Sequence, residues 1–139
     1  MTQRSIARLS AAAVFLSAAT HPALAATTLV GHIGSKAGPQ NARVWSVQLM
    51  NAGPNTASAA QFKGFTLTQT SGAACTPVVT PPSSYPVALG DIGSGSSASA
   101  AFTVDFTGCP ANASFILSIP YSADSGATTG TIVRYHQFR

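Results

Sequence analysis

Apolar and polar residues alternate with period two along much of the chain, which is the pattern of half-buried β-strands. The alternation is clear at residues 45–49, 65–68, 98–106 and 114–121, and a β-branched and aromatic run follows at residues 129–138. No stretch after residue 25 carries the apolar stripe of an amphipathic helix. The pattern predicts a core built from Trp45, Val47, Leu49, Phe65, Leu67, Ala98, Ala100, Phe102, Val104, Phe106, Phe115, Leu117, Ile119 and Tyr121.

Turn-forming residues separate these runs. Gly, Pro, Asn and Asp gather at residues 51–54, 71–72, 81–82, 90–95, 108–110 and 124–126. We interpret residues 90–95 as a hairpin turn, residues 29–33 as a first strand and residues 34–41 as a loop. The proline-rich segment 77–88 predicts at most a short strand at a sheet edge. Short strands with turn signals at this spacing predict an all-β fold, an antiparallel immunoglobulin-like β-sandwich with about seven strands.

The first 25 residues have the layout of a secretory signal peptide. Arg4 and Arg8 precede an apolar run, and Ala23-Leu24-Ala25 supplies the small residues of a cleavage site. The apolar run is too short to span a membrane, which takes roughly 20 residues. We therefore predict cleavage between Ala25 and Ala26. The expected product is one domain, residues 26–139, with no membrane span, exported to the periplasm, the cell surface or the medium.

Charge and cysteine content narrow the class of protein further. Of the seven Lys and Arg residues, two lie in the predicted leader. The remaining five and the three aspartates give residues 26–139 a net charge of +2. No cluster of cations could follow a phosphate backbone, so we expect no nucleic-acid partner. In an oxidising compartment Cys75 and Cys109 would form one disulfide, which would contribute about 3–4 kcal/mol by constraining the unfolded chain.

Candidate chemistry is sparse along the sequence. There is no Gly-x-Ser-x-Gly nucleophile motif and no Glu, and His32 and His136 have no second metal ligand nearby. We expect no catalytic residues, no cofactor and no metal, although folding could still bring two of the aspartates together. Trp45 has two interpretations, as a core anchor or as an exposed residue that stacks on sugar.

Two turn motifs resemble those of a known group of domains. One is Asn51-Ala52-Gly53-Pro54, and the other runs from Leu89 to Ser96, where Leu89, Ile92, Gly95 and Ser96 match the turn pattern of the group. Residues 42–137 resemble the bacterial extracellular immunoglobulin-like domains of the cell-adhesion-related (CARDB-type) and conserved-repeat surface-protein kind. The resemblance implies adhesion, spacing or display outside the cell, and it implies no catalytic residues.

Three classes of function remain open from the sequence. The first is a non-catalytic structural or binding module that contacts another extracellular protein, or a second copy of itself, through a sheet edge at Thr131–His136. The second is a subunit of a surface fibre joined by strand exchange, for which residues 27–33 are the candidate donor strand. The third is a small secreted hydrolase or carbohydrate-binding domain.

Overall fold

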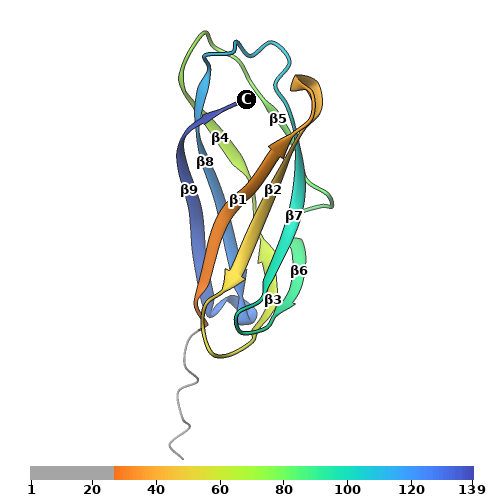
Figure 1. The fold of residues 1–139 in the computed structure, drawn as a ribbon, viewed down its shortest axis with the longest axis vertical. Coiled ribbons are helices and arrows are strands. Elements are labelled where there is room, and N and C mark those ends of the chain that lie inside the picture. Colours follow the sequence, from red (N-terminus) through yellow and green to blue (C-terminus); the bar gives the residue numbers. More distant parts are fainter. Residues whose placement is uncertain (1–26) are drawn as a thin grey trace, which may run out of the picture.

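The chain folds into two antiparallel sheets packed face to face. The computed structural model describes residues 27–139, so the predicted signal peptide and the cleavage position between Ala25 and Ala26 lie outside the described residues. The sheets form the β-sandwich seen in Figure 1, which confirms the predicted all-β class. Its strands are β1 (Leu29–Ala37), β2 (Arg43–Asn51), β3 (Ala57–Phe62), β4 (Thr66–Ser71), β5 (Val78–Thr80), β6 (Val87–Ile92), β7 (Ser97–Asp105), β8 (Ser114–Ala123) and β9 (Thr128–Phe138).

The strand order is that of an immunoglobulin-like sandwich. One sheet has the order β1-β2-β7-β5, which corresponds to strands A, B, E and D of that fold. In the other sheet, β8 pairs with β9 on one side and with β4 and β3 on its other side. β8 therefore corresponds to strand F of the fold, β9 to strand G, and β3 and β4 together to strand C. Because β3 and β4 follow one path along β8, interrupted at residues 63–65, they act as two halves of one strand. β6 extends this sheet beyond β3.

The core contains the aromatic residues that the alternation predicted. Trp45 is fully buried, and its ring centroid lies 5.8 Å from that of Phe65 and 5.9 Å from that of Phe106. Phe102 contacts Phe65 from the facing sheet, at 5.0 Å between centroids. The interpretation of Trp45 as a core anchor is confirmed, and its interpretation as an exposed sugar-stacking residue is wrong. Leu67, Ala98, Ala100 and Tyr121, also predicted to face the core, are partly buried against it.

Three local predictions are wrong, each because a distant partner decides the local structure. The predicted loop at residues 34–41 is strand as far as Ala37, since β1 keeps pairing with β2 past a register shift between Ile33 and Ser35. The predicted hairpin turn at residues 90–95 crosses between sheets instead, since β6 pairs with β3 and β7 with β2. Residues 27–139 form nine strands rather than about seven, because the alanine-rich β3 and the glycine-containing β6 carry almost no alternation of their own. The short edge strand predicted within residues 77–88 is confirmed as β5.

Candidate functional site

The outermost strands of the two sheets are the places where another chain could pair with this one. Among the described residues these strands are β1, β5, β6 and β9, together with β4, which pairs with β8 on one side only. An outermost strand presents unpaired N–H and C=O groups, and proteins commonly block such an edge with bulges, prolines, inward-pointing charges or covering side chains. The five edges differ in how far such features block them.

The edge of β1 is covered by side chains from the other sheet. The carbonyl of Leu29 accepts a hydrogen bond from the Tyr121 hydroxyl at 3.0 Å, and the carbonyl of Gly31 accepts one from Arg134 Nη2 at 2.9 Å. Both donors come from β8 and β9, so each of these main-chain carbonyls already has one side-chain donor lying across the edge. β1 also pairs with β2 along its whole length, from Leu29 opposite Asn51 to Ala37 opposite Val44. Residues 27–33, predicted from the sequence as a candidate donor strand, are thus bonded to the rest of the domain, residues 29–33 as part of β1.

A lysine on β1 also points inward. Lys36 Nζ lies 3.9 Å from the centroid of the Trp45 ring and donates a hydrogen bond of 2.6 Å to Gln137 Oε1. Burial lowers the pKa of Lys36, and the positive charge of Arg43 lowers it further. An inward-pointing cation beside a bulge is one of the features that keep an edge strand from adding a partner.

The β4, β5 and β6 edges are short or bent. The pairing of β4 with β8 shifts register after Gln69, and Gln69 Nε2 donates to the carbonyls of Ser71 and Ala73. β5 has three residues, and Pro77 and Pro81 flank it. β6 shifts register twice against β3, and Gly90 within it has a φ of +78°. None of these three edges offers a long, regular row of main-chain groups for another strand.

The edge of β9 is regular and uncharged. Every residue from Thr128 to Arg134 has a partner on β8, with no register shift between them, and within the described residues β9 pairs with no other strand. No residue from Thr128 to Val133 carries a charge. Thr129, Thr131 and Val133 are exposed, whereas Ile132 between them is buried in the core.

The register shows which main-chain groups face away from β8. Thr131 lies opposite Pro120, which has no N–H, so this is a non-hydrogen-bonded pair of the antiparallel ladder. Since the two kinds of pair alternate, the N–H and C=O groups of Thr129, Thr131 and Val133 point outward from the sheet. The Val133 carbonyl accepts a hydrogen bond of 2.8 Å from Arg134 Nη1. A carbonyl oxygen has two lone pairs, so it can accept a second hydrogen bond.

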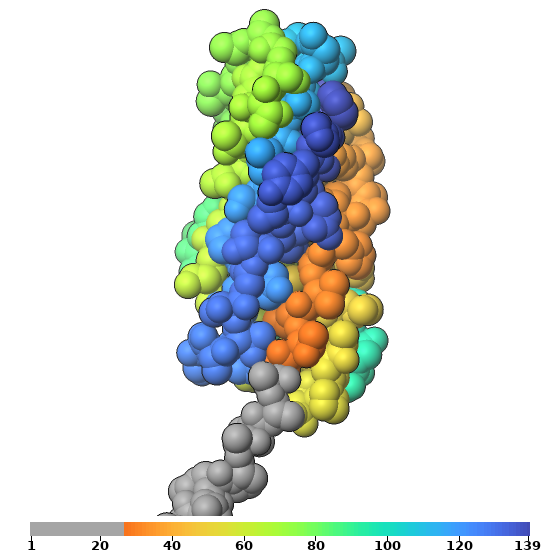
Figure 2. Space-filling model, turned by 90° about the vertical axis from the view of Figure 1, so that its left-hand side faces the viewer, coloured from red at the N-terminus to blue at the C-terminus, as the bar shows by residue number. Residues whose placement is uncertain are grey.

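A bulge ends the regular part of this edge. Between Arg134 and Gln137 the pairing with β8 shifts register, and His136 takes a φ of +53°. Beyond Arg134 the side chains of Tyr135 and Phe138 are 64% and 51% exposed. The segment predicted from the sequence, Thr131–His136, therefore lies on an outermost strand, but the regular edge begins earlier, at Thr128, and stops at Arg134. Figure 2 shows β9, in the darkest blue, at the front of the molecule directly beside β1 in orange.

Asp124 anchors the start of β9. Its carboxylate accepts hydrogen bonds from the Thr27 hydroxyl, from Thr128 Oγ1 at 2.7 Å and from the Ser58 backbone N–H at 2.8 Å. The Thr27 and Thr128 hydroxyls and the Ser58 N–H stabilise the ionised form and lower the pKa of Asp124 to about 2. The turn before β9 therefore keeps a negative charge and ties the first described residue to the sandwich.

Replacing Asp124 by asparagine should lower the stability of the fold in a pH-dependent way. Because the pKa of Asp124 is below its usual value of 3.8 in the folded protein, its ionised form stabilises the fold above about pH 4, and this contribution is lost as the pH falls through about 2. We expect a loss of about 1 kcal/mol at pH 6, allowing for solvent screening of this surface group. Urea unfolding at pH 2–6 should show the difference from wild type vanishing near pH 2. Asn112→Ala, at an exposed position with no ionisable side chain, is the control, and its difference from wild type should not vary with pH.

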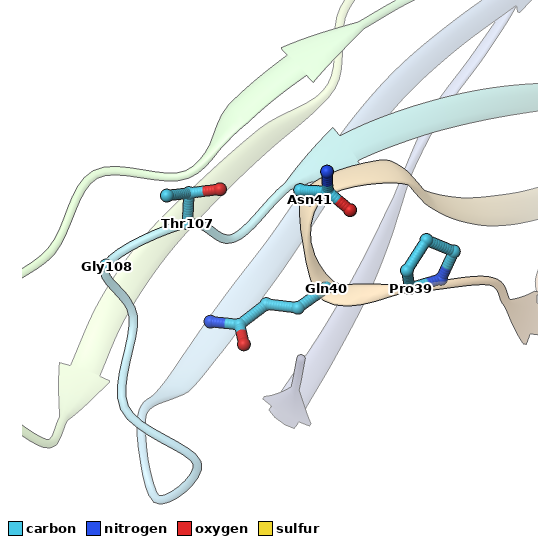
Figure 3. Close-up of a pocket in the computed structure, with 5 residues that line it drawn as sticks. All are labelled: Pro39, Gln40, Asn41, Thr107 and Gly108. Carbon is cyan, nitrogen blue, oxygen red and sulfur yellow. The ribbon is translucent and has the colours of Figure 1, made fainter.

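The opposite end of the sandwich holds a shallow depression of about 430 Å³. Pro39, Gln40 and Asn41 from the β1–β2 loop line it together with Thr107 and Gly108 from the β7–β8 loop, as Figure 3 shows. Gln40 Nε2 donates to the carbonyls of Phe106 at 2.8 Å and Cys109 at 3.0 Å. The amide thus joins the two loops, and none of the five residues has an ionisable side chain.

Two of the three aspartates bond adjacent residues of β3, since Asp124 accepts the Ser58 N–H and Asp91 accepts the Ala59 N–H. Cys75 and Cys109 form a disulfide, with Cα atoms 5.2 Å apart. The carboxylates of Asp91 and Asp105 accept hydrogen bonds from the backbone of Ala59 and Thr107. Within residues 27–139, no group of three or more His, Cys, Asp or Glu side chains, His32 and His136 included, is placed to hold a metal ion. The same residues include no helix long and apolar enough to cross a membrane.

Comparisons with family models, with curated proteins and with solved structures find no match to this chain. The resemblance to CARDB-type domains therefore stays a prediction. The structure does give a physical basis for the two turn motifs on which it depends. Asn51 Nδ2 of the first motif donates to the Ile92 carbonyl of the second at 2.9 Å, and Ser94 Oγ donates to the Gly53 carbonyl at 2.7 Å.

Proposed function

We propose that this protein is an exported, non-catalytic binding module that contacts another chain through the unpaired edge of β9. The observation that carries the proposal is the regular, uncharged row of main-chain groups at Thr129, Thr131 and Val133, on a fold whose other edges are covered, short or bent. Export is supported by the signal-peptide pattern of residues 1–25 and by the disulfide, which persists in oxidising compartments.

The mode of contact is addition of a strand to the sheet. A partner strand beside β9 would form hydrogen bonds with the outward N–H and C=O groups of β9. These main-chain bonds would supply affinity that does not depend on the partner's side chains. Specificity would come from alternate side chains of the edge, the two threonines and Val133. This mode needs no pocket, cofactor or ionisable side chain.

Site-specific photocrosslinking in the producing cell tests the proposal. p-Benzoylphenylalanine in place of Val133 should yield a discrete crosslinked product, because its ring would lie at the contact. The same group in place of Ser99, exposed on β7 in the other sheet, is the matched control and should yield none. A product from the Ser99 position alone, or from neither position, would show that β9 is not the contact surface.

A further inference from the structure

We infer that the partner strand at this edge is β9 of a second copy of the chain, antiparallel and related by a two-fold axis at Thr131. The inference rests on the proposed function and names its partner. It follows from the distribution of charge along β9, from the direction of its main-chain groups and from the side chains that the two-fold axis would bring together.

Charge along β9 favours antiparallel pairing with itself. The uncharged stretch Thr128–Val133 lies between the carboxylate of Asp124 at one end and the guanidinium of Arg134 at the other. A two-fold axis at Thr131 places Arg134 of each copy opposite Thr128 of the other, and Thr128 is the residue that donates a hydrogen bond to Asp124. The cationic end of each strand thus meets the acidic turn of the other, whereas parallel pairing would place like charges together.

The main-chain groups match in the same register. In such a pair, residues whose N–H and C=O groups point away from β8 must lie opposite each other. The two-fold axis meets this requirement, because it pairs Thr131 with Thr131 and Thr129 with Val133. These are hydrogen-bonded pairs, in which the two residues exchange both N–H···O bonds. The resulting Thr–Thr and Thr–Val neighbours are β-branched, a kind of cross-strand pair that stabilises sheets.

The surrounding side chains leave this edge accessible. Ile132 points into the core. The Arg134 guanidinium donates to the Gly31 carbonyl of β1 and to the Val133 carbonyl, so it contacts only the last of the three outward-facing residues, and the groups of Thr129 and Thr131 lie away from it. A contact of one short strand edge is smaller than the roughly 1,200 Å² that stable complexes bury, so the association is expected to be weak and to depend on concentration.

Sedimentation velocity over a concentration series tests for the dimer, and charge variants at the axis locate it. The wild-type protein should shift from monomer toward dimer as concentration rises. Thr131→Lys and Thr131→Asp should each raise the dissociation constant at least tenfold, because each places two like charges next to each other at the axis. An equimolar mixture of the two variants should dimerise again, since the same position then carries opposite charges. Ser99→Lys, the same change in charge on the other sheet, should dimerise as wild type does.

The result of the mixture distinguishes a specific two-fold contact from a folding defect. Thermal unfolding by circular dichroism should show that all the variants keep the fold, and a misfolded variant would not regain dimerisation on mixing. A wild-type protein that stays monomeric at every concentration, or a dimer unchanged by either variant at Thr131, would overturn the inference. Failure here together with a crosslink from Val133 to a different protein would leave the proposed function standing. Failure of both experiments would refute both proposals.

Discussion

Replacing Asn51 by alanine is expected to lower the free energy of unfolding by about 3 kcal/mol, one of the two largest effects predicted for this chain. Asn51 is fully buried, and its side-chain amide bonds three main-chain groups. Nδ2 donates to the carbonyls of Asn55 at 2.6 Å and Ile92 at 2.9 Å, and Oδ1 accepts the Gly53 N–H at 3.0 Å. The bonds to Ile92 and Gly53 are buried, so removing the amide deprives these two groups of that partner at a cost of about 1 kcal/mol or more each, and the partly buried bond to the Asn55 carbonyl is lost as well.

Urea unfolding of Asn51→Ala, Asn51→Asp and Asn112→Ala measures this contribution. Asn51→Asp should destabilise the fold at least as much as alanine, because a carboxylate cannot donate to the two carbonyls and brings a charge into a buried site. Asn112 is exposed in the β7–β8 loop, and its replacement by alanine should change stability by less than about 0.5 kcal/mol. Equal midpoints for Asn51→Ala and Asn112→Ala would refute the assigned role of the Asn51 amide.

Asn51 illustrates how far a sequence motif can be interpreted. The Asn-x-Gly-Pro motif at residues 51–54 indicated a turn, which the structure confirms. The sequence did not indicate that the same amide donates to the carbonyl of Ile92, the last residue of β6, 41 positions away along the chain. That contact exists because β2 and β6, which belong to different sheets, end at the same end of the sandwich. The alternation of apolar and polar residues does not show which strand ends lie together.

The same limit applies to the fold as a whole. Strands with large alternating side chains, such as β2 at Trp45, Val47 and Leu49, were predicted correctly because burial of those side chains alone decides their conformation. β3 was missed because its buried residues Ala57 and Ala60 are too small to make the alternation visible. The second half of β1 was missed because glycine and polar residues there become strand only through pairing with β2.

The sequence predicted that the candidate site lies on the last strand, but it did not predict which residues form the regular edge. The β-branched composition of residues 129–138 indicated a terminal strand, and the structure places it at an outermost position. The sequence could not show that Tyr121 and Arg134 cover the β1 edge, since those bonds join β1 to side chains about a hundred positions away along the chain. Which edge is left unpaired is therefore a property of the folded sandwich, and it becomes visible only once both sheets are in place.

Removing the disulfide, by Cys75→Ala together with Cys109→Ala, is expected to lower the free energy of unfolding by about 3–4 kcal/mol. The two cysteines are 34 positions apart, and their bond joins the β4–β5 connection to the β7–β8 connection. Both connections pass between the two sheets, so the bond restricts the unfolded chain across a loop that contains β5, β6 and β7. Alanine is chosen because Cys109 is buried, and a serine hydroxyl there would add the cost of an unpaired polar group.

Urea unfolding with and without a thiol reductant checks this prediction. Reductant should destabilise the wild-type protein by about the same amount as the double substitution and should leave the double variant unchanged. The loops around the cysteines keep other bonds, because Gln69 Oε1 accepts the Cys75 N–H and Gln40 Nε2 donates to the Cys109 carbonyl. We therefore expect the double variant to fold at low temperature and to retain the β9 edge, so that its self-association should match that of wild type. A wild-type stability that reductant does not alter would show that the bond contributes nothing to the folded protein, and a double variant that folds but no longer associates would show that the disulfide also supports the β9 edge.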